Sequence, residues 1–273
     1  MLRRQDKLKK LQSIFKRYKK VLIAFSGGVD STFLLKVAVD SLGKKNVLSA
    51  TAISQTYPKS DLLTANRIIE KLGIKNIFIN TNELNNKDFV CNTPKRCFWC
   101  KNELFRSLSK IANKNKINVI CDGTNYSDKD DYRPGMLASQ KWNIRHPLLE
   151  AKMSKNEIRI LSKKLGLPTW NKEISPCLAS RFPYGQRITI KKLKKISNAE
   201  NELKKLHLKN LRLRDYEDTA RIEIDKDQLK KIFKTNIYNK IVTILKKYNY
   251  KYITLDLEGY RTGSLNQAIK KIF

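Results

Sequence analysis

Histidine, acidic residues and long apolar runs are all scarce in this chain of 273 residues. Only two histidines are present, so a histidine-based zinc centre has almost no ligands to draw on. No apolar run approaches the roughly 18–20 residues that cross a bilayer, so we expect no membrane-spanning segment. Neither the P-loop pattern GxxxxGK(S/T) nor the dinucleotide-binding pattern GxGxxG occurs, which excludes two common kinds of nucleotide-binding loop.

Acidic residues are outnumbered, 25 against 57 basic residues, which gives a formal net charge of +32. Such a charge is typical of proteins that bind nucleic acid or an anionic membrane. Most of the basic residues are lysines spread along the whole chain, however, and no block of like charge stands beside a neutral body. We therefore interpret most of the charge as a lysine-rich solvated surface. With 41% hydrophobic residues the chain can form a core, which excludes general disorder.

Five cysteines make an odd and small number for a disulfide framework in a chain of this length. The first twenty residues are charged, with leucine and isoleucine at helical spacing, and are typical of neither a secretory signal nor an anchor. These observations predict a cytoplasmic protein whose cysteines stay reduced. In that setting clustered cysteines are more often metal ligands or nucleophiles than disulfides.

An apolar run at residues 21–25 is followed at once by a glycine-rich turn and then by residues with helical periodicity. A strand, turn and helix in this order direct free backbone N–H groups and the positive end of the helix dipole at an anion. Gly27 and Gly28 would let the backbone approach phosphate oxygens, and Asp30 could hold Mg²⁺ or orient a loop amide. The pattern predicts a phosphate-binding loop, with an ordinary serine-capped glycine turn as the alternative.

Predicted strands and helices alternate in the N-terminal part, which indicates an α/β fold with a parallel sheet and helices on both faces. Further strands are expected at residues 47–52, 77–80 and 118–121, and helices at 1–19, 59–72, 101–114 and 155–165. An irregular stretch then marks a predicted boundary that gives domains 1–185 and 186–273. The smaller domain is predicted to be α+β, with helices at 190–206 and 227–247 and strands at 210–213, 220–224 and 252–257.

The string SGGVDST at Ser26–Thr32, on an apolar strand near the N-terminus, resembles the signature of the PP-loop ATP pyrophosphatases. That resemblance implies a fold of the adenine nucleotide alpha hydrolase type. It also implies cleavage of Mg²⁺-bound ATP between its α- and β-phosphates. The adenylate formed in this way would activate a carboxylate or a carbonyl-type oxygen, but the motif says little about the substrate.

Two cysteines form a CxxC pair, Cys97 and Cys100, at the start of a predicted helix. Such a pair is typical of a metal-cluster site, of half a zinc site or of a redox dithiol. His146 and His207 are the only histidines that could complete a zinc site, and we interpret them as a structural and a solvated side chain. Together with Cys177, the CxxC pair could hold three irons of a [4Fe–4S] cluster and leave the fourth iron open for sulfide.

The remaining cysteines have simpler interpretations. Cys121 lies in a buried-strand pattern and is predicted to be a core residue. Cys91 is interpreted as a spare thiol. Cys177, by contrast, has Arg181 as a basic neighbour, and a nearby positive charge favours the reactive thiolate.

Several further strings resemble the LarE family of PP-loop sulfur transferases, and together they span nearly the whole chain. They are DGTN at Asp122–Asn125, DDYRPG at Asp130–Gly135, PCLASRFPYG at Pro176–Gly185, RLR at Arg212–Arg214, ARIE at Ala220–Glu223 and TLDLEGYRTG at Thr254–Gly263. The resemblance implies an enzyme that adenylates the carboxylates of pyridinium-3,5-biscarboxylic acid mononucleotide with ATP and converts them to thiocarboxylates. These steps belong to the synthesis of the nickel-pincer nucleotide cofactor. Family members with a CxxC pair relay sulfide on a [4Fe–4S] cluster, and this chain resembles those members.

The resemblance also implies the site residues. For ATP they are Ser26, Gly27, Gly28, Asp30, Ser31, Thr32, Asp122, Gly123 and Thr124. For the phosphate of the mononucleotide they are Arg181, Arg212, Arg214 and Arg261, and for the cluster they are Cys97, Cys100 and Cys177. Cys177 and Asp30 are the predicted catalytic residues, and Glu200 and Glu223 are candidate acid/base or orienting groups. Arginine suits a phosphate because its planar fork pairs bidentately with it.

These predictions imply ATP, an anionic nucleotide substrate and a sulfide donor as partners, with the C-terminal domain binding substrate or forming a homo-oligomer. The main alternative is a cluster-dependent tRNA thiolase of the same superfamily, which the net charge of +32 would suit. A non-catalytic RNA-binding module is a second alternative, although the aromatic residues show no RNP-like pattern. An amidating synthetase would not need three cysteines.

Overall fold

The computed structural model describes residues 4–56, 59–128, 134–173, 176–234 and 236–268. By their contacts the described residues form two compact units. The first falls within Met1–Glu83 and Cys97–Ser175, and the second falls within Leu84–Arg96 and Pro176–Phe273. The second unit therefore begins ahead of the predicted boundary after residue 185, and it includes a segment from the first half of the chain. The roles predicted for the two domains stay predictions.

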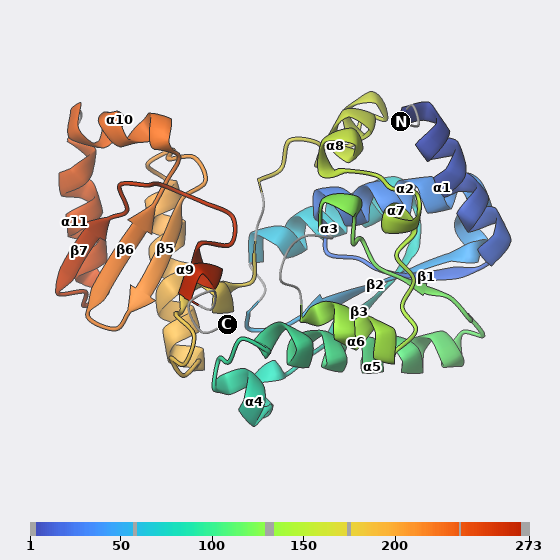
Figure 1. Cartoon of the computed structure of the whole chain (residues 1–273), viewed down its shortest axis with the longest axis horizontal. Helices are drawn as coiled ribbons and strands as arrows, with labels where there is room; N and C mark the ends of the chain where they lie inside the picture. Colours follow the sequence, from blue (N-terminus) through green and yellow to red (C-terminus); the bar gives the residue numbers. More distant parts are fainter. Residues whose placement is uncertain (1–3, 57–58, 129–133, 174–175, 235, 269–273) are drawn as a thin grey trace. The chain divides into compact units, whose positions relative to one another are not determined.

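The first unit contains a parallel sheet of four strands in the order β3-β2-β1-β4 (Figure 1). Its strands are β1 (Val21–Ala24), β2 (Val47–Ile53), β3 (Lys75–Asn80) and β4 (Ile120–Cys121). β1 pairs in parallel with both β2 and β4 and so lies inside the sheet. The predicted parallel α/β fold is confirmed, and each strand overlaps the range predicted for it.

Helices cover both faces of this sheet (Figure 1). They are α1 (Arg4–Tyr18), α2 (Val29–Leu42), α3 (Lys59–Leu72), α5 (Arg96–Lys114), α6 (Gly135–Lys141), α7 (Pro147–Glu150) and α8 (Lys155–Lys164), with 3₁₀ turns η1 (Lys44–Asn46), η2 (Glu83–Asn85) and η3 (Tyr126–Asp128). The apolar sequence of β1 follows from its burial on both sides. Val21 and Ile23 pack into the core that contains α1 and α2, whereas Leu22 packs into the core that contains α5.

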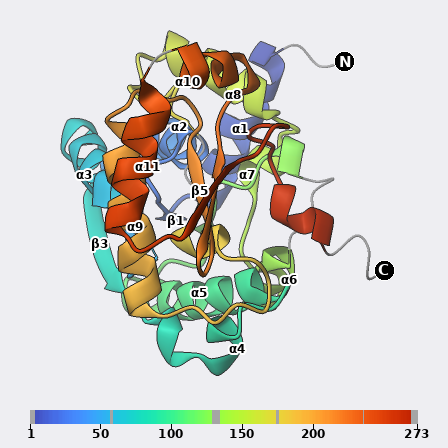
Figure 2. The ribbon, with the colours of Figure 1, turned by 90° about the vertical axis from the view of Figure 1, so that its left-hand side faces the viewer.

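The second unit contains a three-stranded sheet in the order β5-β6-β7, with β5 antiparallel and β7 parallel to β6 (Figure 1). Figure 2 shows the same unit turned by 90°. Its strands are β5 (Arg212–Tyr216), β6 (Thr219–Glu223) and β7 (Tyr252–Leu255). Its helices are α4 (Lys87–Val90), α9 (Ile190–Lys204), α10 (Leu229–Lys234) and α11 (Ile237–Lys247), with 3₁₀ turns η4 (Leu178–Arg181), η5 (Lys226–Gln228) and η6 (Ser264–Ala268). Helix α9 contacts both β5 and α11, so helices pack on the sheet in a small α+β arrangement, as predicted.

One predicted element of this unit is wrong. A single helix was expected over 227–247, but the chain forms two separate helices, α10 and α11. The backbone leaves the helical conformation at Asn236, the N-cap residue of α11, and asparagine favours helix ends over helix interiors. No helix in the part of the chain that the structure describes is long and apolar enough to cross a membrane.

Candidate active site

The predicted phosphate loop lies between β1 and α2 in the first unit (Figure 1). Gly28 caps α2 with an extended backbone, so the N–H groups of the first helical turn point out of the helix end. Ser31 organises the turn: its Oγ accepts a hydrogen bond from the Ser26 N–H at 3.3 Å and donates to the Gly28 carbonyl at 3.3 Å. The two serine Oγ atoms lie 3.1 Å apart. This geometry is compatible with the predicted phosphate loop, because backbone N–H groups at a helix N-terminus can bind an anion.

Two glycines are required where backbone segments approach each other at the loop. Gly27 has a φ of +63°, and a Cβ at this position would lie 3.0 Å from the Cβ of Ala65 on α3. A Cβ at Gly123, just after β4, would lie 3.1 Å from the backbone nitrogen of Ser31. Residues that follow β1 and β4 thus meet at the carboxyl end of the sheet, which is where parallel α/β sheets bind ligands.

Gly27→Ala is expected to lower the free energy of unfolding by about 1–3 kcal/mol, because a side chain is strained at positive φ. It would also press on α3 and weaken ATP binding. Gly166→Ala is the matched control, because Gly166 has a similar φ of +64° but nothing lies within 4 Å of the place its Cβ would take. Urea unfolding measures stability and calorimetry measures ATP affinity. Equal effects of both substitutions on ATP affinity would contradict the close approach at Gly27.

Asp30 lies in the first turn of α2 and is mostly buried. Its Oδ2 pairs at 2.5 Å with the Nζ of Lys155, the first residue of α8 after a capping box formed by Ser154 and Glu157. Its Oδ1 is buried and has no hydrogen-bond partner among the described residues. Burial raises the pKa of Asp30, and the charge of Lys155 opposes that shift. A buried carboxylate oxygen without a partner is a donor that fits Mg²⁺.

Asp122 follows β4 and lies against three polar groups. Its Oδ2 pairs with Lys101 at 3.2 Å, and its Oδ1 lies 2.6 Å from His146 Nδ1 and accepts from the Thr124 N–H at 3.0 Å. Burial alone would raise the pKa of Asp122, but the charge of Lys101 and these hydrogen bonds outweigh it and lower the pKa below its ordinary value. Asp122 is therefore held as a carboxylate that fixes the turn beside the phosphate loop.

Sequence reasoning missed four side chains that contact the predicted ATP residues; they are Lys101, His146, Lys155 and Lys172. Lys172 donates to the Gly27 carbonyl at 3.1 Å and pairs with Asp61 of α3 at 2.8 Å. No local signal distinguishes one such lysine among 57 basic residues. Thr32, a predicted ATP ligand, is fully buried in α2, and its Oγ1 has no hydrogen-bond partner within the described ranges. Of the string at Asp130–Gly135, residues 130–133 lie outside the described residues.

The CxxC pair lies at the start of α5, so that Cys97 and Cys100, three residues apart, stand on one side of the helix. Cys97 is exposed, and the Sγ of Cys100 lies 3.7 Å from a carboxylate oxygen of Glu83. Cys121 is fully buried, and burial raises the pKa of its thiol, which confirms it as a core residue. Cys91 is exposed at the end of α4. None of the five cysteines forms a disulfide.

The three predicted cluster ligands are divided between the units, because Cys97 and Cys100 belong to the first and Cys177 to the second. Among the described residues there is no group of three or more histidine, cysteine, aspartate or glutamate side chains placed to hold a metal ion. The shared three-cysteine site therefore stays a prediction.

Cys177 is the N-cap residue of η4 in the second unit. Its Sγ accepts a hydrogen bond from the backbone N–H of Ala179 at 3.3 Å, an arrangement that stabilises negative charge on sulfur. Arg181, at the end of the same turn, donates through Nη1 to the carbonyls of Pro176 at 3.0 Å and Cys177 at 3.4 Å. The predicted neighbour Arg181 thus acts on the backbone of the cysteine turn.

Arg181 is itself held by a buried ion pair with Glu200 of α9. Its Nε and Nη2 donate to the two carboxylate oxygens at 2.7 and 3.0 Å, and each side chain is only 2% exposed. Burial alone would lower the pKa of Arg181 and raise that of Glu200. The ion pair outweighs burial and shifts both in the opposite direction, so both groups stay charged. Glu200 also accepts from the Leu213 N–H of β5 at 3.0 Å, which ties the pair to the sheet.

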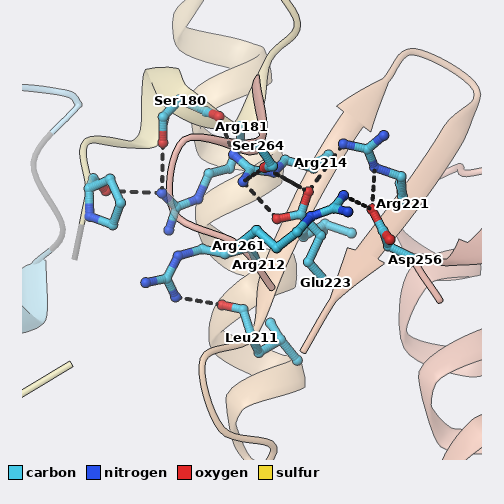
Figure 3. A network of polar contacts seen from close by, with 12 residues as sticks. Ser180, Arg181, Leu211, Arg212, Arg214, Arg221, Glu223, Asp256, Arg261 and Ser264 are labelled. Atoms are coloured by element: carbon cyan, nitrogen blue, oxygen red, sulfur yellow. Dashed lines mark hydrogen bonds and ion pairs between the residues drawn. The ribbon is translucent and has the colours of Figure 1, made fainter. Parts of the chain in front are cut away.

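A second bidentate pair joins Arg214 of β5 to Glu223 of β6 (Figure 3). Arg214 donates to the two carboxylate oxygens at 3.0 and 2.7 Å, and its Nη1 donates to the Ser180 carbonyl at 2.6 Å. Arg221 and Ser264 also donate to Glu223, at 3.1 and 3.3 Å (Figure 3). Glu200 and Glu223, considered from sequence as acid/base or orienting groups, are therefore orienting partners of arginines in this structure.

The structure brings the four predicted phosphate ligands together in the second unit; they are Arg181, Arg212, Arg214 and Arg261 (Figure 3). Arg212 is nearly buried, lies over the ring of Tyr260 at 5.0 Å and donates to the Leu211 carbonyl at 2.7 Å. Burial, together with the nearby charge of Arg181, lowers the pKa of Arg212. The positive charges of Arg181 and Arg214 act on Arg212 although both are paired with carboxylates, and the charge of Glu200 opposes their effect.

A pocket of about 260 Å³ opens beside these arginines. Arg221 and Arg261 line it together with Tyr184 and Tyr216. Arg261 pairs with Asp256 at 3.5 Å and with Glu258 on the surface side. The pocket therefore combines aromatic rings with two guanidinium groups, each of which is paired with a carboxylate.

The parallel sheet and the SGGVDST turn at the start of α2 define a PP-loop α/β protein. The sequence model of the NAD synthase family matches residues 4–97, the part that contains this loop. Over the whole chain, the sequence is 33% identical to the pyridinium-3,5-bisthiocarboxylic acid mononucleotide synthase of Lactiplantibacillus plantarum, across 96% of this chain and 94% of that protein. The chain therefore belongs to the LarE family.

Two further relatives extend the same similarity to distant organisms. An uncharacterized protein of Synechocystis is 39% identical over 98% of this chain and 99% of its own length. An uncharacterized protein of Methanocaldococcus jannaschii is 34% identical over 96% of this chain and 98% of its own length. Both alignments span the two units described here, so the pairing of a PP-loop unit with this α+β unit is shared.

Proposed function

We propose that the protein is an ATP-dependent sulfur transferase that forms the thiocarboxylates of the nickel-pincer nucleotide cofactor. Its substrate would be pyridinium-3,5-biscarboxylic acid mononucleotide, whose carboxylates are adenylated and then converted to thiocarboxylates. The observation that carries this proposal is the similarity to the pyridinium-3,5-bisthiocarboxylic acid mononucleotide synthase, which extends over 96% of the chain.

In the first half-reaction a substrate carboxylate attacks the α-phosphate of ATP, and pyrophosphate leaves. The loop at Ser26–Thr32 would hold the phosphates through its N–H and hydroxyl groups, which stabilises the charge that develops on the leaving group. Asp30 Oδ1, which has no hydrogen-bond partner among the described residues, would hold Mg²⁺, and the metal would supply Lewis acidity to this step. The turn Asp122–Thr124 would complete the nucleotide site, since Gly123 lies against Ser31.

In the second half-reaction sulfur attacks the acyl carbon, the bond to the adenylate oxygen breaks and AMP leaves. The donor set of Cys97, Cys100 and Cys177 fits an iron–sulfur cluster, because all three are soft thiol ligands and none is tied up in a disulfide. A [4Fe–4S] cluster bound by three cysteines would keep one iron free of protein ligands, on which sulfide can be carried. The N–H of Ala179 directed at Cys177 Sγ supports the thiolate that such a ligand must be.

The arginines of the second unit would bind the phosphate of the mononucleotide. The proposal gives this role first to Arg212 and Arg261, and Arg181 and Arg214 would support it while holding the cysteine turn. The proposal also includes a cytoplasmic location and a homo-oligomeric assembly. The proposed partners are ATP, the mononucleotide and a separate sulfide donor, and they do not include nucleic acid.

The decisive experiment gives anaerobically reconstituted protein Mg²⁺, ATP and sulfide, with either the pyridinium dicarboxylate mononucleotide or tRNA. AMP, pyrophosphate and thiolated product are quantified by liquid chromatography with mass detection. We expect AMP and a thiocarboxylate only with the mononucleotide. Product formed only with tRNA would contradict this proposal and indicate a tRNA thiolase, an activity that the net charge of +32 would suit.

A further inference from the structure

The segment Leu84–Arg96 belongs by its contacts to the second unit, although the residue that follows it is Cys97. Asn92 is its anchor. This side chain is completely buried and donates through Nδ2 to the carbonyls of Phe182 at 3.3 Å and Pro183 at 2.7 Å. The Asn92 carbonyl accepts from the Gly185 N–H at 3.0 Å. Asn92 also has a φ of +53°, a conformation that asparagine tolerates better than most residues. The segment is thus locked onto the chain just after the Cys177 turn.

Arg96, the last residue of this segment, is 6% exposed and donates through Nη1 to the carbonyl of Ala179 at 3.0 Å. The same Nη1 donates to Asn92 Oδ1, and the guanidinium lies 5.7 Å from the centre of the Tyr184 ring. No carboxylate is paired with Arg96 among the ion pairs of the described residues. Its buried guanidinium group therefore binds a backbone carbonyl of η4, that of Ala179, two residues after Cys177.

Side chains hold nearly every carbonyl of the turn that carries Cys177. Arg181 binds the carbonyls of residues 176 and 177, Arg214 binds that of residue 180, and Asn92 binds those of residues 182 and 183. Arg96 completes the set at residue 179. Of these side chains only Arg96 is bonded to a cysteine of the CxxC pair, because Cys97 follows it in the chain and consecutive Cα atoms are about 3.8 Å apart.

We propose that Arg96 is a positioning residue that joins the Cys177 turn to the first cysteine of the CxxC pair, so that the three thiols are presented to one iron–sulfur cluster. This inference rests on the proposed function, since it concerns the cluster assigned there. All the hydrogen bonds that support it lie inside the second unit. Arg96 would ligate nothing itself; it would act through the backbone at Ala179 and through its covalent bond to Cys97.

The test compares Arg96→Gln with Arg106→Gln, a change at an exposed arginine on the same helix, α5. Each protein is reconstituted anaerobically with iron and sulfide. Iron content and cluster absorbance are then measured, followed by the rate of iron loss to a chelator at a temperature where all variants are folded. Outer-sphere changes of this kind typically cost about 10–100-fold in metal affinity, so we expect iron loss from Arg96→Gln to be faster by about that factor. Arg106→Gln should match the unaltered protein.

Arg96→Lys gives a second comparison, because lysine keeps the charge but lacks the rigid guanidinium plane that holds Nη1 between Asn92 and Ala179. We expect Arg96→Lys to lose iron faster than the unaltered protein and more slowly than Arg96→Gln. If Arg96→Gln does not fold, Arg96→Lys alone tests the role of Arg96. Iron loss at the unaltered rate from folded Arg96 variants overturns the inference while leaving the proposed function intact. If the unaltered protein takes up no iron, the iron–sulfur cluster in the proposed function is wrong, and this inference is wrong with it.

Discussion

Replacing Glu200 by alanine is expected to destabilise the protein by about 3–5 kcal/mol, the scale on which removing one partner of a buried ion pair acts. Arg181 would keep its charge at 2% exposure without the carboxylate that now accepts two of its N–H groups. The Leu213 N–H of β5 would lose its acceptor as well. Urea unfolding followed by circular dichroism measures the change in the free energy of unfolding.

Glu202→Ala is the matched control, because Glu202 lies on the same helix, α9, but is 34% exposed and contacts Tyr248 and Lys247 near the surface. We expect it to cost less than about 1 kcal/mol, as surface pairs do. Glu200→Gln should fall between the two alanine variants, since an amide can keep one acceptor oxygen for Arg181. A loss as small for Glu200→Ala as for Glu202→Ala would show that Arg181 is solvated in the folded protein.

The same pair predicts a pH dependence with a definite sign. The pKa of Glu200 is lowered in the folded state from its ordinary value of 4.5, so folding favours the ionised carboxylate. Its stabilising contribution is fully present above pH 4.5 and is lost as the pH falls through the lower pKa of the folded state. The unaltered protein should therefore lose stability below pH 4.5 more steeply than Glu200→Gln. Parallel pH profiles for the two proteins would contradict the assignment.

Local patterns were sufficient to predict the part of the fold that carries the phosphate loop. The run at residues 21–25 is apolar at every position because β1 is buried on both faces, and that pattern differs from the alternation of a half-exposed strand. The glycine at position 27 is needed because its φ is +63° and a Cβ there would lie against Ala65. The break between α10 and α11 was not predicted, because a single asparagine changes helical periodicity too little to stand out.

Partners of the charged residues could not be predicted, and the reason is physical. Ion pairs and hydrogen bonds form across the fold. Lys155 pairs with Asp30, and Lys172 donates to the Gly27 carbonyl, over more than a hundred positions of sequence. The Arg-x-Arg string correctly indicates two basic side chains on one face of β5, but it carries no sign that Glu223 already binds Arg214. With 57 basic residues, composition hides the few that are buried, and burial is what gives their charges large effects.

Cys177→Ala is expected to abolish thiolation and to leave ATP cleavage in place. The cysteine lies in η4 of the second unit, whereas the phosphate loop, Asp30 and the Asp122 turn lie in the first. The rate of thiocarboxylate formation should fall by about 10³-fold or more, the scale on which removal of a group central to the chemistry acts. Release of pyrophosphate on addition of the mononucleotide should stay within a few-fold of the unaltered rate, because the carboxylate and ATP still meet.

Cys91→Ala is the control for this substitution, because Cys91, like Cys177, forms no disulfide but is exposed at the end of α4. It should retain both activities. Pyrophosphate is followed with a coupled phosphate assay and the thiocarboxylate by mass detection, from the same reaction. Loss of both activities in Cys177→Ala would mean that the turn shapes the nucleotide site, since the alanine also removes the sulfur that accepts the Ala179 N–H. If Cys177→Ala still thiolated its substrate at the full rate, Cys177 would take no part in sulfur transfer. The proposed three-cysteine cluster site would then be wrong.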